Sequence, residues 1–233
     1  MQNFMLKERV REKQTTIRLL IGVCAGILMM LLSYWMDGFG LMSDAEAWMT
    51  RPVWSYALCM ILAMPSVPAM CVGLSGWYEI ICSVQAKHWV KRLFVVAAVC
   101  YAVSSLYLIA IDCLPPIVFQ TAADLGIAPE VSLSLIERIE HPYAIPIIVF
   151  FLIEDLGISV VLWQLVLSGK LSLSKWGLIC CPAVMLMADV LLKLIPSVLA
   201  RNISVTLESA GWMLFMLAGL IHLKRRGDLN DRT

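Results

Sequence analysis

In this 233-residue chain, the residues best suited to carry out chemistry are charged side chains inside long apolar stretches. Glu154 and Asp155 are adjacent in one stretch, and Asp189 and Lys193 lie one helical turn apart in the next. An Asp or Lys at the centre of a membrane helix costs about 2.5–3.5 kcal/mol, which disfavours contact with lipid. We therefore expect Lys193 to pair with Asp189 or with the Glu154–Asp155 pair inside the protein.

Three acids against one lysine leave excess negative charge that a low-dielectric site does not hold easily. At least one carboxyl is expected to be protonated or to bind a cation. Further polar side chains recur at helical spacing in neighbouring stretches. The sequence predicts a substrate or ion site, reached from the non-cytoplasmic side, formed by Tyr101, Ser105, Asp112, Glu154, Asp155, Asp189, Lys193 and Glu208.

This pattern of buried charges is compatible with two classes of function. The first is binding or transport of a small solute, coupled to protons or cations, with a small molecule or a cation as ligand. The second is a non-catalytic scaffold or accessory protein whose buried charges only hold the helices in register. The protein partner of such a scaffold cannot be named from the chain.

An enzyme ranks third. The eight cysteines show no C-x-x-C spacing and the three histidines are far apart in sequence, so we expect no metal site and no cofactor. The string Gly73-Leu74-Ser75-Gly76 is similar to the nucleophile motif of rhomboid proteases, with His222 as its possible partner. The spacing of Asp189 and Lys193 is similar to that of an aspartate and a lysine in the retinal-binding helix of microbial rhodopsins. Short strings recur by chance, and we interpret both matches in that way.

The elements that must position these residues are membrane helices. The composition is 61% hydrophobic and the mean hydropathy is +0.83, values too high for a soluble globule. Each apolar stretch is close to the ~20 residues that cross a bilayer as a helix. We predict an all-α bundle of six transmembrane helices at about residues 19–36, 53–74, 93–114, 145–167, 176–199 and 207–223.

Basic residues predict the orientation of these helices. Fourteen of the eighteen fall in the N-terminal tail, the second and fourth connections and the C-terminal tail. Positive charge favours the cytoplasmic side, so we expect both termini inside a bacterial cytoplasmic membrane. The predicted organisation is a basic tail (1–18), a membrane domain (19–223) and a second basic tail (224–233). The tails suit the lipid surface, and nothing favours nucleic acid.

Small residues and prolines predict local features. Gly22 and Gly26 form a G-x-x-x-G pair, which is typical of close helix packing. Pro65 and Pro68 in the second stretch, and Pro182 and Pro196 in the fifth, predict kinks or unwound turns. The third connection, 115–142, carries a short amphipathic pattern and is expected to place a helix on the outer membrane surface.

The layout resembles a family of uncharacterised bacterial integral membrane proteins, known as a domain of unknown function. The likeness is carried by the first apolar stretch, which begins Leu20-Ile21-Gly22 and ends at Asp37, and by the start of the last, Glu208-Ser209-Ala210-Gly211-Trp212. That family supplies no activity. The chain is also similar to the six-helix substrate-binding subunits of vitamin uptake systems, which implies an outward-facing site.

Overall fold

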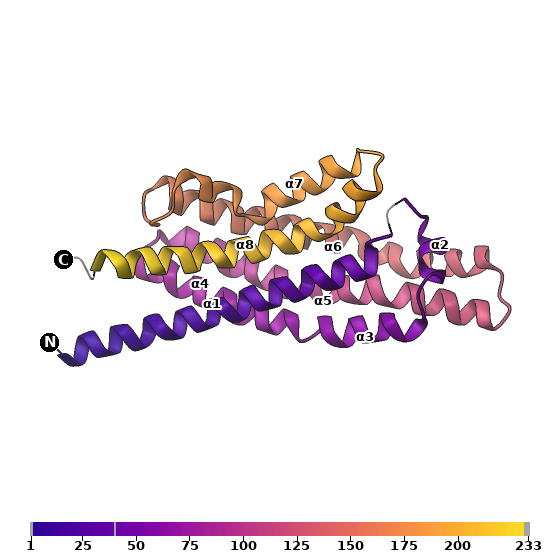
Figure 1. The fold of residues 1–233 in the computed structure, drawn as a ribbon, viewed down its shortest axis with the longest axis horizontal. Coiled ribbons are helices and arrows are strands. Elements are labelled where there is room, and N and C mark those ends of the chain that lie inside the picture. The colour runs from indigo at the N-terminus through magenta and orange to yellow at the C-terminus, as the bar shows by residue number, and fades with distance from the viewer. Residues whose placement is uncertain (1, 40, 231–233) are drawn as a thin grey trace.

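The computed structural model describes residues 2–39 and 41–230, and these form a bundle of helices without strands. The long helices run along one axis, and the N- and C-terminal ends lie at the same end of the bundle (Figure 1). The prediction of an all-α fold is confirmed. Arg232, counted in the predicted C-terminal basic tail, lies outside the described residues.

The first half of the chain crosses the bundle and returns. Helix α1 (Gln2–Asp37) leads to a short helix, α2 (Asp44–Met49), at the end opposite the termini (Figure 1). The backbone and the hydroxyl of Ser43 donate to the Glu46 carboxylate at 3.1 and 2.7 Å, and these bonds lower the pKa of Glu46. The chain returns through α3 (Val53–Ala63) and α4 (Ser66–Ser83), which are separated at Pro65, as proline predicts.

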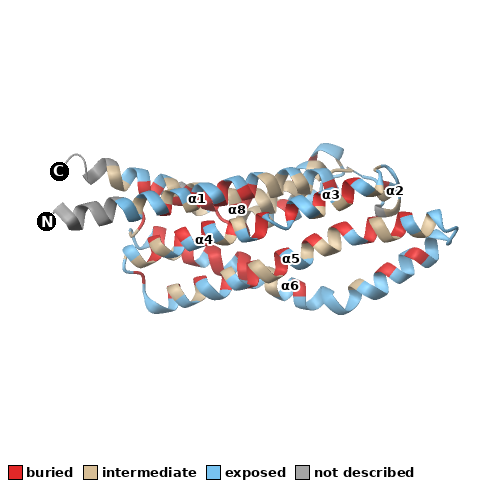
Figure 2. Ribbon diagram, turned by 90° about the horizontal axis from the view of Figure 1, so that it is seen from below, coloured by how far each residue is buried: buried red, intermediate tan, exposed pale blue. Residues whose placement is uncertain are grey.

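The third connection differs from its prediction. Helix α5 (His88–Asp124) and helix α6 (Pro129–Leu167) extend past the other helices and meet in a short turn (Figure 1). The amphipathic segment is the first part of α6 and not a separate surface helix. Pro129 begins the helix, where a missing N–H costs nothing, and Pro142 does not interrupt it. This end of α6 is largely exposed (Figure 2).

The fifth predicted span also differs. Five helical segments are long and apolar enough to cross a membrane among the described residues: Val10–Asp37, Val53–Ser83, His88–Asp124, Pro129–Leu167 and Val198–Gly227. The stretch 176–199 instead forms a 3₁₀ turn, η1 (Lys175–Ile179), and the 12-residue helix α7 (Pro182–Lys193). At 1.5 Å per residue α7 is only ~18 Å long.

Prolines explain the shortness of α7. Pro182 occupies its first turn, and Pro196 lies in the irregular segment before α8 (Val198–Asn230). The η1–α7 segment nevertheless runs away from the terminal end of the bundle, and α8 runs back to it (Figure 1). The predicted count of six full membrane helices is not confirmed, and a broken segment takes the place of the fifth.

The segments predicted to be cytoplasmic meet at the terminal end of the bundle. Lys170 in the fourth connection donates to the Val84 and Gln85 carbonyls of the second at 3.3 and 2.6 Å. Arg226 near the C-terminus donates to the Ser83 hydroxyl at 3.3 Å. The basic segments therefore share one end of the molecule, as their predicted common side of the membrane requires.

Close packing joins α1 to α4 and α8. A Cβ on Gly22 would lie 3.0 Å from the Gly73 Cα, and one on Gly26 would lie 2.9 Å from the Met213 Cβ. Only glycine permits helices to approach so closely. The packing predicted for Gly22 and Gly26 is confirmed, and it takes place within the chain. Trp77 completes this core, since its indole N–H donates to the Phe215 carbonyl at 3.0 Å.

Candidate functional site

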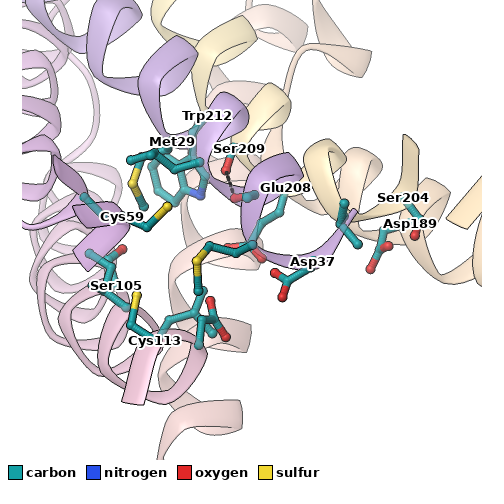
Figure 3. Close-up of a pocket in the computed structure, with 18 of the residues that line it drawn as sticks. Met29, Asp37, Cys59, Ser105, Cys113, Asp189, Ser204, Glu208, Ser209 and Trp212 are labelled. Atoms are coloured by element: carbon teal, nitrogen blue, oxygen red, sulfur yellow. Dashed lines mark hydrogen bonds between the residues drawn. The ribbon is translucent and has the colours of Figure 1, made fainter. Parts of the chain in front are cut away.

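A cavity of about 420 Å³ lies in the half of the bundle opposite the termini. Its walls come from α1, α5, α7 and α8, with further contributions from α3, α4 and the connection that contains α2. Figure 3 shows side chains from these elements converging on the space. This volume falls within the range of ~300–1,000 Å³ usual for small-molecule sites.

Six of the eight predicted site residues line this cavity. They come from three helices: α5 contributes two hydroxyl groups and an acid, α7 an acid and a base, and α8 an acid. Side chains on one helical face recur every three or four residues, which explains how α5 presents several of them to the same space. The six are Tyr101, Ser105, Asp112, Asp189, Lys193 and Glu208.

Asp189 and Lys193 form one of the two ion pairs that the sequence left open for this lysine. The Lys193 ammonium lies 2.8 Å from the Asp189 Oδ2, across one turn of α7. The lysine side chain is 47% exposed and the aspartate side chain 11%. The other oxygen of Asp189, Oδ1, is buried and has no hydrogen-bond partner. The ion pair therefore satisfies only one of the two carboxylate oxygens of Asp189.

Two charged residues of the cavity wall are absent from the predicted site. Asp37 lies at the end of α1, and Arg201 lies in the first turn of α8. The spacing from Gly26 to Asp37 places this acid on the packing face of α1, and that signal could have found it. Arg201 lies in the fifth connection of the predicted layout and gave no such signal. The cavity wall thus contains four acids and two bases: Asp37, Asp112, Asp189, Glu208, Lys193 and Arg201.

Aromatic and sulfur-containing side chains form the rest of the wall. The rings of Tyr101 and Trp212 lie 4.3 Å apart, and Trp48 lines the side near α2. Met29 and Cys59 are on one side of the cavity, whereas Asp37 and Asp189 are on another (Figure 3). The cavity therefore has an apolar, polarisable part and a charged part, an arrangement that suits an amphipathic solute.

The two remaining predicted residues, Glu154 and Asp155, do not line the cavity. Both are completely buried in α6, and the Ser104 hydroxyl makes a very close hydrogen bond with Glu154. Neither forms an ion pair with Lys193, whose described partner is Asp189. The structure does not bring this pair into the cavity, and its predicted role in binding a substrate or an ion stays a prediction. Counting residues gives the depth of a side chain in the membrane, but it does not give the neighbour that the side chain faces.

Comparison with known proteins gives one result that covers most of the chain. Residues 6–226 match the model of the Family of unknown function (DUF6796). The chain belongs to this family. No curated protein and no solved structure shows a significant match to it. The DUF6796 family has no known function, so the chemistry of the cavity must be argued from the residues that line it.

The short motifs of this DUF6796 member have structural roles. Ser75 is exposed and donates to the Val72 carbonyl at 2.7 Å, while His222 accepts a hydrogen bond from the Ser172 backbone N–H at 2.9 Å. Gly73 is the glycine that lets α4 approach α1. Across residues 2–39 and 41–230, no three His, Cys, Asp or Glu side chains are grouped so that they could hold a metal ion.

Proposed function

We propose that this integral membrane protein binds a small, positively charged solute in the cavity between α1, α5, α7 and α8. The observation that carries the proposal is a cavity of about 420 Å³ whose wall contains four acidic and two basic side chains. Lys193 is already paired with Asp189, and Asp112 and Glu208 together outnumber the remaining base of the wall, Arg201. A cation is the ligand that balances this charge at the lowest cost in a low-dielectric setting.

The aromatic side chains of the wall support an organic cation over a bare metal ion. The rings of Trp212 and Tyr101 pack against each other and both line the cavity. The face of an aromatic ring attracts an ammonium group by about 0.5–2 kcal/mol. The methionine and cysteine side chains would contact the apolar part of such a solute.

We further propose that the cavity is reached from the non-cytoplasmic side of a bacterial cytoplasmic membrane. The basic connections and tails share the end of the bundle that holds the termini, and positive charge favours the cytoplasmic side. The cavity lies in the opposite half. This placement suits a receptor or transporter that takes its solute, coupled to protons or cations, from outside the cell.

The test uses the purified full-length protein in lipid nanodiscs and three cationic probes: sodium, putrescine and choline. The neutral analogue of choline, 3,3-dimethylbutanol, measures the contribution of the positive charge. Binding is followed by calorimetry and by the shift in melting temperature. We expect at least one cationic probe to bind and the neutral analogue to bind at least about tenfold more weakly, a difference of ~1.4 kcal/mol.

Matched variants locate the binding site. Glu208→Gln removes one carboxylate from the cavity, whereas Glu79→Gln removes a carboxylate that pairs with Arg18 at 2.6 Å, away from the cavity wall. We expect the first variant to weaken binding of the cationic probe and the second to leave it unchanged. Equal binding of the charged and neutral probes, or equal binding by the two variants, would contradict the proposal.

The scaffold remains the second candidate, and the Asp189–Lys193 pair is the observation that favours it. A pair within one helix can serve to neutralise α7 without any ligand. This reading predicts that Asp189→Asn lowers the melting temperature while no probe binds the wild-type protein. The solute-binding reading predicts that Asp189→Asn stays folded and loses binding.

A further inference from the structure

Two adjacent acids of α6 are buried in the protein without a cation to pair with. Glu154 and Asp155 are both 0% exposed. Three of their four carboxyl oxygens, Glu154 Oε1 and both of Asp155, have no hydrogen-bond partner. Neither acid belongs to the Arg18–Glu79 pair or to the Lys193–Asp189 pair. Two ionised carboxylates in such surroundings would be very costly.

The hydroxyl of Ser104 can form a hydrogen bond with either protonation state of Glu154. It is placed to donate to the Glu154 carboxyl, and its oxygen also lies 2.9 Å from the Cys100 carbonyl and 3.1 Å from the Tyr101 carbonyl. A hydroxyl has one proton to donate, and its oxygen can also accept. Ser104 can therefore donate to an ionised Glu154, or it can donate to a backbone carbonyl and accept from a neutral Glu154.

The groups that face this pair come from α5 and α8. Cys100, Tyr101 and Ser104 lie on α5, near Glu154. Glu208 and Trp212 lie on α8, where Glu208 is close enough to act electrostatically on both acids. These neighbours are neutral or acidic, so they supply no positive charge that would stabilise an ionised pair.

Trp212 connects the pair to the cavity. Its ring lines the cavity wall, and its indole N–H is close enough to act on Asp155, although its geometry falls short of a hydrogen bond. Trp212 therefore lies beside both the cavity and Asp155.

We propose that Glu154 and Asp155 form a proton-binding site in the membrane interior, in which the pair holds at least one proton at neutral pH and exchanges it with the cavity past Trp212. On release, the proton leaves a carboxyl oxygen of the pair for water in the cavity, and the Ser104 hydroxyl turns from a backbone carbonyl to donate to the Glu154 carboxylate. This site does not depend on the binding of a solute in the cavity.

Infrared spectroscopy of the full-length protein in lipid nanodiscs tests the proposal. A protonated carboxyl group gives a C=O stretching band that is separate from the carboxylate bands and moves to lower frequency in D₂O. We expect this band in the wild-type protein at neutral pH and a weaker band in the double variant Glu154→Gln/Asp155→Asn, because in a single variant the remaining acid can keep the proton. Glu79→Gln is the control, because Glu79 is paired with Arg18 and should add nothing to the band.

Three results of this experiment would contradict the proposal. Absence of the band in the wild-type protein would overturn the proposal without any variant, so a variant that fails to fold does not weaken the test. A band that keeps its full amplitude in the double variant would also overturn it, because the proton would then belong to other carboxyl groups such as Asp112 or Glu208. A band that fails to shift after long exposure to D₂O would refute the exchange with the cavity.

Discussion

Gly22 of α1 and Gly73 of α4 are in direct backbone contact: a Cβ on Gly73 would lie 2.7 Å from the Gly22 Cα. This contact sets the distance between two helices on which the cavity depends, because α1 provides Gly26, Met29 and Asp37 to its wall. A glycine pair of this kind stabilises a membrane protein through van der Waals packing, since lipid supplies little hydrophobic driving force between helices.

Replacing Gly73 with alanine is expected to lower stability by about 1–3 kcal/mol, because the added methyl group meets backbone that cannot move independently. The measurement is thermal unfolding of the purified protein. Gly227→Ala is the matched control, since nothing lies within 4 Å of a Cβ at that position of α8. Alanine there is expected to stabilise slightly, as it does in helix interiors. Equal melting temperatures for Gly73→Ala and the wild type would show that the two helices separate freely.

The variant Trp77→Phe removes the indole N–H of Trp77 and is expected to lower the free energy of unfolding by about 1–3 kcal/mol. The ring of Trp77 is fully buried, stacks on Phe215 with centroids 4.3 Å apart, and donates to the Phe215 carbonyl. Trp54→Phe is the control, because Trp54 is 64% exposed on the helix surface and should change stability little. A comparable loss in both variants would point to a general effect of tryptophan and not to this contact.

The Asp189–Lys193 pair is expected to show a coupling free energy below about 1 kcal/mol in a double-mutant cycle of Asp189→Asn and Lys193→Met. The lysine is half-exposed toward the cavity, so water screens the interaction. The cycle is measured from unfolding of the four proteins in the same detergent. A coupling of several kcal/mol would instead mean that the cavity is dry and that the charges are paired in a low dielectric.

Reporter fusions are expected to place the two ends of the bundle on opposite sides of the membrane. A fluorescent protein fused at the C-terminus should fluoresce in bacterial cells, whereas alkaline phosphatase fused after Gly126 should be active. The reason is that Gly126 lies in the α5–α6 turn, at the end opposite the termini. Active phosphatase at the C-terminus would invert the proposed orientation and place the cavity on the cytoplasmic side.

Much of the candidate site could be predicted from the sequence. Charged residues inside apolar stretches must be partnered, and helical spacing shows which of them share a face. This reasoning identified Asp189 with Lys193 and the polar face of α5. It did not separate Glu154 and Asp155 from the cavity, because periodicity describes one helix at a time and says nothing about which neighbour covers each face.

The amino-acid sequence by itself determined that the chain is an all-α membrane protein, because the length and apolar character of each stretch act locally. It also determined where helices break, at Pro65, Pro182 and Pro196. Only the tertiary structure decided that the fifth predicted span is a broken segment, that Arg201 joins the cavity and that Glu154 is buried against Ser104. Those outcomes depend on how far neighbouring helices approach and how they are rotated. Contacts between residues distant in sequence set both, and the glycine contact between α1 and α4 is one of them.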